Sequence, residues 1–190
     1  MKKILLGICA LVLTFPLTTY AAEQQKEVVV SGGNLAFNQA QLNFTDITLA
    51  STKSNQTSKA TTKVKAVDSR GNGSGWTYSV SATDFVTTMG EEQFTLPIST
   101  VKYSATVVDT ISGVPLDFTS GGEIAQNKVL SNQPGVVLSV EPGKGQGAYE
   151  FEVAYNLTLP KTIRNTQGKE IGVVAGKYQS VFTYTATSGI

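Results

Sequence analysis

The residues whose spacing suits acid–base chemistry are Glu150 and Glu152, which alternate with aromatic and aliphatic residues in the segment 149–157. Two carboxylates at positions i and i+2 share one face of a strand and lie about 7 Å apart, a separation used by inverting glycoside hydrolases. Charged residues on the solvent side of a strand follow the same pattern and are far more common. We therefore predict that the protein is not an enzyme, with a secreted glycan hydrolase as the alternative.

A glycine-rich turn at residues 68–75 carries oxygen-bearing side chains. Asp68, Asn72 and Ser74 could contact a calcium ion, but the segment lacks the acidic density and the closing glutamate of a calcium-binding loop. The chain has no histidine, and its single cysteine, Cys9, falls within the predicted leader. These absences exclude disulfides, His-ligated metals and Ser-His or Cys-His catalysis in a processed chain. We predict no metal and no cofactor.

The same turn has a structural interpretation. An ion pair of Arg70 with Asp68 or Asp84 would hold it in place. Its glycines allow the positive φ angles that a tight or bulged entry into a strand requires. The residues assigned to this structural turn are Asp68, Arg70, Gly71, Gly73 and Gly75.

Aromatic residues near both ends of the chain are the candidates for binding. The only tryptophan, Trp76, shares one face of an alternating segment with Tyr78, and Phe182 and Tyr184 are arranged in the same way near the C-terminus. Such residues form aromatic platforms for a sugar or a partner surface, or they pack in the core, where each hides about 150–250 Å². The binding candidates are Trp76, Tyr78, Phe182 and Tyr184.

Residues 1–21 have the pattern of a secretory signal peptide: two lysines, an apolar run over 4–17 and a small-x-small cleavage site at 19–21. The run is too short and too early for a membrane span, and we expect none in the mature chain. Of the 15 Lys and Arg, two belong to the leader, so the 14 Asp and Glu leave a mature net charge of about −1. No basic excess remains to attract nucleic acid.

The remaining chain has the pattern of strands separated by turns. No segment of useful length combines a 3.6-residue period with a capping residue, so we predict an all-β fold, a single-domain antiparallel β-sandwich of two packed sheets. Regular alternation marks strands at 76–82, 101–107 and 149–157. Further strands are expected at 27–30, 62–67, 136–140, 171–174 and 178–187.

Other segments are harder to assign. Residues 22–62 are expected to supply N-terminal strands and a polar loop of the domain, and 63–190 the rest of it. Within the first part, the Thr-rich segment 50–62 is either a loop or an edge strand. Pro97 favours an edge position for 94–98, because proline cannot donate a backbone hydrogen bond. Residues 109–135 are expected to be irregular.

The order of several motifs resembles the WxL family of Gram-positive cell-surface proteins. The first block is Asp68-Ser69-Arg70-Gly71 followed by Gly75-Trp76, and the later ones fall at 145–147, 157–160 and 175–178. The resemblance covers most of residues 63–187. In place of the two name-giving Trp-x-Leu motifs stand Trp76-Thr77-Tyr78 and Tyr184-Thr185-Ala186.

The resemblance implies a secreted protein attached non-covalently to peptidoglycan of the cell wall, and assembly with partner surface proteins encoded nearby. It therefore favours a binding or adhesion module at the cell surface. A structural subunit of a surface appendage or multiprotein complex is the alternative, because the valine-rich segment 27–30 and the Thr-rich segment 50–62 could pair with strands of other chains.

Overall fold

The computed structural model describes residues 27–50 and 56–189. The predicted signal peptide and Cys9 lie outside this part. The chain divides into two units, one ending at Val30 and one beginning at Ser31. In the described part of the first unit no strand forms, and Val28, Val29 and Val30 are 86%, 79% and 89% exposed. The predicted strand at 27–30 is therefore wrong, because β-branched residues form a strand only where a neighbouring strand pairs with them.

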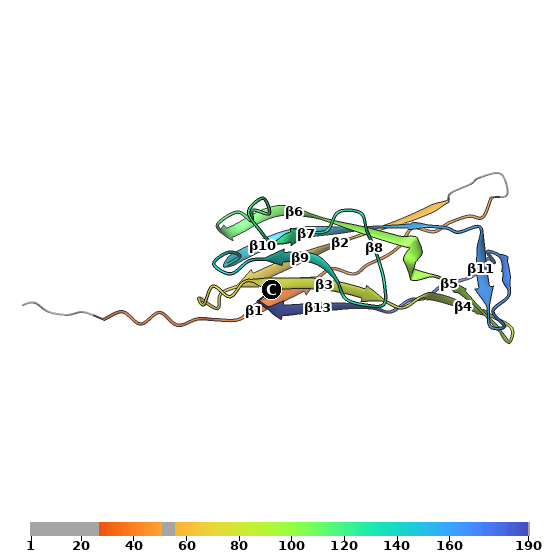
Figure 1. Ribbon diagram of the computed structural model, residues 1–190, viewed down its shortest axis with the longest axis horizontal. Coiled ribbons are helices and arrows are strands. Elements are labelled where there is room, and N and C mark those ends of the chain that lie inside the picture. The colour runs from red at the N-terminus through yellow and green to blue at the C-terminus, as the bar shows by residue number, and fades with distance from the viewer. Residues whose placement is uncertain (1–26, 51–55, 190) are drawn as a thin grey trace, which may run out of the picture. The chain divides into compact units, whose positions relative to one another are not determined.

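The second unit contains a five-stranded antiparallel sheet (Figure 1). Its strands lie in the order β1 (Leu35–Gln39), β2 (Thr57–Asp68), β10 (Gly147–Thr158), β6 (Val101–Gly113) and β8 (Lys128–Val129). β2 and β10 pair over their full lengths, from Thr57 opposite Thr158 to Asp68 opposite Gly147. These two long strands form the centre of the sheet.

Two four-stranded sheets complete the unit. The first has the order β13 (Phe182–Ser188), β3 (Trp76–Ala82), β9 (Gly135–Val140) and β7 (Glu123–Ile124). The second has the order β12 (Glu170–Gly172), β11 (Thr162–Asn165), β5 (Glu92–Leu96) and β4 (Phe85–Met89), and a 3-10 turn at Ile98–Thr100 links β5 to β6. The predicted all-β sandwich is confirmed, and the small third sheet is an addition to the two that were expected.

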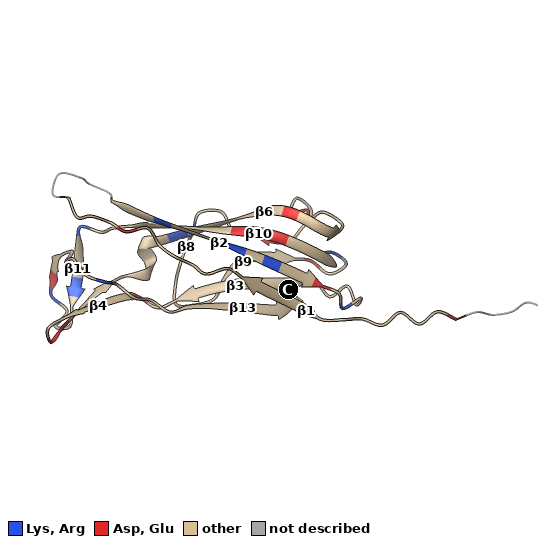
Figure 2. Cartoon of the chain, turned by 180° about the vertical axis from the view of Figure 1, so that it is seen from behind, with Lys and Arg blue, Asp and Glu red and all other residues tan. Residues whose placement is uncertain are grey.

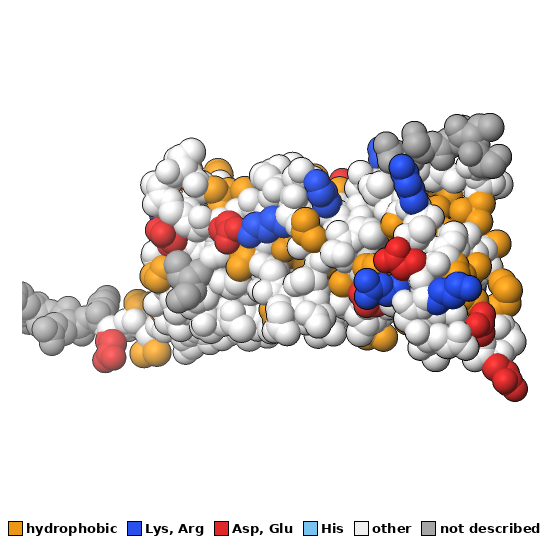
Figure 3. All heavy atoms as spheres, turned by 45° about the vertical axis from the view of Figure 1, so that its right-hand side comes forward, with side chains coloured by type: hydrophobic (Ala, Val, Ile, Leu, Met, Phe, Trp, Pro, Cys, Tyr) orange, Lys and Arg blue, Asp and Glu red, His pale blue; other side chains and the backbone are white. Residues whose placement is uncertain are grey.

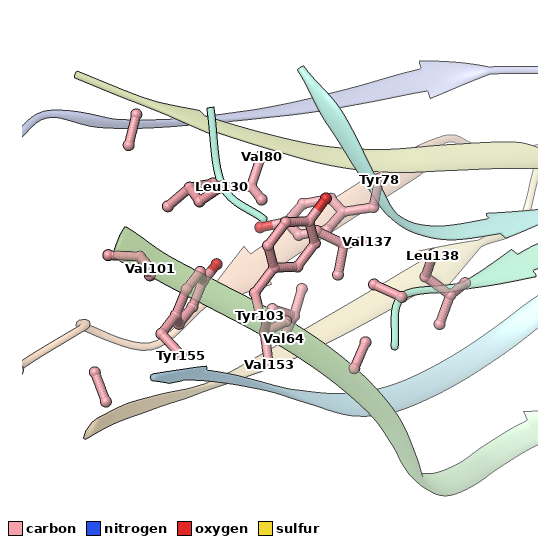
Figure 4. Packing of buried hydrophobic residues seen from close by; sticks show 14 of the residues in the cluster. Val64, Tyr78, Val80, Val101, Tyr103, Leu130, Val137, Leu138, Val153 and Tyr155 are labelled. Atoms are coloured by element: carbon pink, nitrogen blue, oxygen red, sulfur yellow. The ribbon is translucent and has the colours of Figure 1, made fainter. Parts of the chain in front are cut away.

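The core lies between the five-stranded sheet and the sheet of β3, and the alternation of the sequence builds it. In β10 the residues on one face are buried, among them Phe151, Val153 and Tyr155, while their neighbours are half-buried or exposed. β3 alternates in the same way. Figure 4 shows Tyr103 and Tyr155 among aliphatic side chains of several strands. Burial of each large apolar side chain stabilises the fold by about 1.5–3 kcal/mol.

From Thr57 onward the Thr-rich segment is the interior strand β2, neither a loop nor an edge, whereas residues 51–55 of the segment lie outside the described part of the chain. On the side away from β10, two backbone carbonyls of β2 accept hydrogen bonds. The Lys63 carbonyl accepts from the Ala40 N–H and the Lys59 carbonyl from the Thr45 N–H, both at 2.9 Å. The buried Thr62 hydroxyl donates to the Ala40 carbonyl at 2.6 Å. Hydroxyls that bond to backbone can be buried, so a polar pattern here hides an interior strand.

Two other predictions need correction. β5 lies between β11 and β4 rather than at an edge, because Pro97 follows the strand and caps the 3-10 turn. The segment 109–135 is only partly irregular, since β6 continues to Gly113 and the two-residue strands β7 and β8 form within it. Strands of two residues are too short to show a period.

Candidate functional site

The two segments that resemble the family's Trp-x-Leu blocks are adjacent strands. β3 and β13 pair in antiparallel register, with Trp76 opposite Ser188, Val80 opposite Tyr184 and Ala82 opposite Phe182. Residues far apart in the sequence thus form one continuous aromatic face. Tyr78 and Tyr184 stack across the two strands, with ring centres 5.9 Å apart.

The structure separates the four candidate binding residues into two pairs. Trp76 and Tyr78 are 0% and 3% exposed. The indole N–H of Trp76 donates to the Gly145 carbonyl at 3.1 Å, and its ring meets Phe37 edge-on at 5.3 Å. These two aromatics are therefore core residues and present no platform to a ligand. Phe182 and Tyr184 are half-buried.

Phe182 and Tyr184 line a groove of about 1120 Å³. One side of it is the segment 39–49, made of the last residue of β1 and the non-strand residues that follow, and the other is the segment 173–184, which leads into β13 and includes its first residues. Figure 3 shows hydrophobic side chains at the surface toward the end of the sandwich that carries β4, β5 and β11. None of the described strands lies hydrogen-bonded between the segment 39–49 and β13.

Packed aromatic rings form the wall of the groove. The ring centre of Phe44 lies 5.7 Å from that of Phe85, in an edge-on contact, and 6.1 Å from that of Phe182, in a tilted one. Tyr155, from the five-stranded sheet, meets Phe182 edge-on at 5.6 Å. Rings held on three sides have little freedom to rotate, so the groove has a defined shape before any ligand arrives.

Tyrosine hydroxyls and one amide supply the polar groups near the groove. The Tyr155 hydroxyl donates to the Tyr184 hydroxyl at 3.3 Å, and the Tyr78 hydroxyl donates to the side-chain oxygen of Gln39. Burial raises the pKa of Tyr78, Tyr155 and Tyr184 above the ordinary tyrosine value. All three phenols therefore stay protonated and act as neutral hydrogen-bonding groups, without the charge that a catalytic base needs.

The glycine-rich turn contains the ion pair between Arg70 and Asp68. Two guanidinium nitrogens lie 2.8 and 2.9 Å from the two carboxylate oxygens, and Arg70 also donates to the Gly75 carbonyl at 2.6 Å and to the Ser188 hydroxyl. The Arg70 guanidinium holds the pKa of Asp68 below its usual value. Asp84, the other suggested partner, instead accepts the Ile98 N–H at 2.8 Å. Arg70 therefore ties the turn to the end of β13.

Backbone conformation explains the glycines of this turn. Gly71, Gly73 and Gly75 have φ angles of 72°, 62° and 67°. At Gly75 a Cβ atom would lie 2.3 Å from the Val140 carbonyl oxygen, so only glycine fits.

The turn does not assemble a cluster of metal ligands. The Asn72 side-chain oxygen accepts from the Ser74 N–H at 3.1 Å and from the Ser74 hydroxyl at 3.0 Å, while Asp68 is engaged by Arg70. Within residues 27–50 and 56–189, no group of three or more His, Cys, Asp or Glu residues could hold a metal ion.

The two glutamates lie on the outer face of the five-stranded sheet. Glu150 pairs with Lys63 of β2 at 3.0 Å, and Glu152 stands opposite Lys63 in the strand register. In Figure 2 basic positions of β2 and acidic positions of β10 are coloured on neighbouring strands. The carboxylates therefore belong to a charged sheet surface, separate from the groove.

The groove is a feature that the sequence pattern does not predict. Its lining includes Leu42, Phe44 and Ile47 from a segment with no regular strand, together with Val173 and Tyr178. The short apolar pattern of 42–49 was a signal for burial, but its position beside β13 depends on contacts that are distant in sequence.

The described residues contain no helix long and apolar enough to cross a membrane. In comparisons with known proteins, no family model matches the chain, and no curated protein or solved structure matches it significantly. The resemblance to the WxL family therefore stays a prediction that rests on the motifs of the chain itself.

Proposed function

We propose that this protein is a secreted, non-enzymatic binding module of the Gram-positive cell surface, attached non-covalently to peptidoglycan or to a wall-bound partner protein. The observation that carries the proposal is the groove beside β13. It is lined by Ala175, Gly176, Lys177 and Tyr178, and by Phe182 and Tyr184 of the C-terminal block that resembles the family. Several accessible residues of this C-terminal block thus gather at one concave surface, where binding sites are usually found.

The chemistry of the groove favours a polypeptide as the ligand there. Leu42, Phe44, Ile47 and Phe182 give it an apolar lining. β13 pairs only with β3 among the described strands, so its other edge can accept a further strand. A wall-bound partner protein would fit this edge, whereas a contact with peptidoglycan would use the polar outer faces of the sheets.

Sedimentation with purified peptidoglycan tests the wall-binding half of the proposal. We expect the processed chain to be retained in the pellet more than an unrelated β-sandwich domain of similar size and charge. Leu49 lines the groove and is 42% exposed, so Leu49→Glu alters the groove without emptying the core. Its retention should equal that of the unaltered chain, because peptidoglycan would contact the outer faces of the sheets. Retention equal to that of the unrelated domain would remove attachment to peptidoglycan from the proposal.

The protein could also act as a structural subunit of a surface assembly, and a specific observation favours this second function. The chain contains an exposed run of three valines, Val28 to Val30, and β13 has an edge that no described strand covers. A chain that has both an unpartnered strand-forming segment and an unpartnered strand edge has the parts needed for strand pairing between copies.

A further inference from the structure

One feature behind this inference is the open edge of β13. This strand has seven residues and is hydrogen-bonded to β3 along one side. No backbone hydrogen bond joins it to the segment 39–49 within the part of the chain that the structure describes. The groove lies between them, with Phe182 and Tyr184 facing it. An added strand could pair with β13 while its inward side chains fill the groove.

A second feature is the valine run that precedes the sandwich. Val28, Val29 and Val30 are 86%, 79% and 89% exposed. Valine has one of the strongest preferences for strands, yet none of the described strands pairs with these three residues. Three consecutive exposed valines are costly in water, and their burial in an apolar site is favourable.

The chain is too short at this point for the valines to lie along the groove of the same copy. The Gly33 N–H bonds to the Ser69 carbonyl at 2.8 Å, which anchors the start of β1. Gln39, where the groove lining begins, is six residues further along an extended strand, about 20 Å away at ~3.3 Å per residue. Val28, the farthest of the three valines, precedes Gly33 by five residues and reaches at most about 18 Å from it, and Val30 reaches at most about 11 Å.

We propose that the Val28–Val30 segment of one copy adds as a strand to β13 of a second copy and occupies its groove. Side chains of a strand alternate between faces, so Val28 and Val30 enter the groove while Val29 points outward, on the same side as Thr183. Donor and acceptor are different surfaces of the same chain. The contact is therefore head-to-tail and builds open chains of subunits. The inference rests on the structural-subunit function proposed above.

The first test compares two valine variants by light scattering of the processed chain over a range of concentrations. We expect the mass of the unaltered chain to rise with concentration, and Val28→Asp/Val30→Asp to remain a monomer. Val29→Asp is the matched control and should associate like the unaltered chain. These residues are exposed, so the substitutions leave the fold intact. A monomer at every concentration, or equal association of all variants, overturns the inference.

Disulfide trapping tests the register. The chain has one cysteine, Cys9, so a processed chain without the leader carries none. A Val29→Cys preparation mixed with a Thr183→Cys preparation should give a disulfide-linked heterodimer under mild oxidation. Thr88→Cys, on the exposed end of β4, is the matched control. Equal yields with Thr183→Cys and Thr88→Cys would overturn the proposed pairing.

A synthetic peptide of residues 27–34 provides the third measurement. It should bind the Val28→Asp/Val30→Asp chain and not the same chain with Leu49→Glu. Peptidoglycan retention of the same variants distinguishes this inference from the proposed functions. Retention without any self-association overturns strand exchange and leaves wall binding standing. Self-association that is insensitive to the valine substitutions overturns strand exchange and leaves the subunit function standing.

Discussion

Replacement of Arg70 by methionine should destabilise the protein more than removal of any other single ion pair described in the structure. Asp68 is 4% exposed and the Arg70 side chain 12% exposed. The substitution removes two charge-assisted hydrogen bonds from a buried carboxylate and leaves it only the backbone N–H of residue 70, at 3.1 Å. Loss of one partner of a buried pair costs about 3–5 kcal/mol. We expect about 3–4 kcal/mol, since slight exposure lets water reach the carboxylate.

Urea denaturation followed by circular dichroism measures this change. With a slope of about 2 kcal/mol per molar urea for a domain of this size, the midpoint should fall by about 1.5–2 M. Lys63→Met is the matched control, because the Lys63–Glu150 pair is exposed, with side chains 59% and 30% accessible. Exposed pairs contribute about 0–1 kcal/mol. Equal midpoint shifts for the two variants would refute the reasoning.

The pH dependence of the Arg70→Met effect gives an independent check. The pKa of Asp68 is lowered in the folded chain, chiefly by its hydrogen bonds from Arg70. A carboxyl with a depressed folded-state pKa contributes stability that is complete above its unfolded pKa, about 3.9, and is lost as the pH falls through the folded value. The difference between the unaltered chain and Arg70→Met should therefore be full at pH 7 and shrink below about pH 4.

Further predictions concern the core. Trp76→Ala should lower the free energy of unfolding by about 3–5 kcal/mol, and Trp76 fluorescence should resist quenching by acrylamide, because the indole is 0% exposed. Gly145→Ala should cost more than Gly168→Ala in thermal unfolding, although their φ angles are 77° and 75°. A Cβ at residue 145 would lie 2.7 Å from the Trp76 ring nitrogen, whereas none of the described atoms lies within 4 Å at residue 168. In ultraviolet titration part of the tyrosine absorbance, that of Tyr78 and Tyr155, should appear only well above pH 10, and stability should fall as the pH rises past that value. The reason is that burial raises the pKa of Tyr155 in the folded state alone.

Much of the sandwich could be predicted because a strand's two faces are set by local geometry. The alternation in 76–82 and 149–157 identified which side chains turn inward, and the structure buries them. The signal failed where burial depends on hydrogen bonding rather than on apolar character. Ser58 and Thr62 are buried in β2 through hydroxyls that donate to backbone carbonyls, so their polarity concealed an interior strand.

The sequence predicts only part of the candidate site. Phe182 and Tyr184 were recognised by type, but so were Trp76 and Tyr78, which the structure buries completely or almost so. The alternation places all four aromatic side chains on the inward faces of their strands. It does not show which of the two strands lies at the edge of its sheet. That difference arises because β3 has neighbours on both sides, whereas β13 has a neighbour on one.

The class of fold, the inward faces of the long strands and the presence of a glycine-rich turn can be read from the sequence, since each follows from neighbours close along the chain. The folded chain shows in addition that Arg70 pairs with Asp68 and not with Asp84, that β3 and β13 lie together, that the third sheet forms, and that a groove opens beside Phe182. Strand pairing joins residues far apart in the sequence, and its free energy comes from contacts that no local pattern specifies.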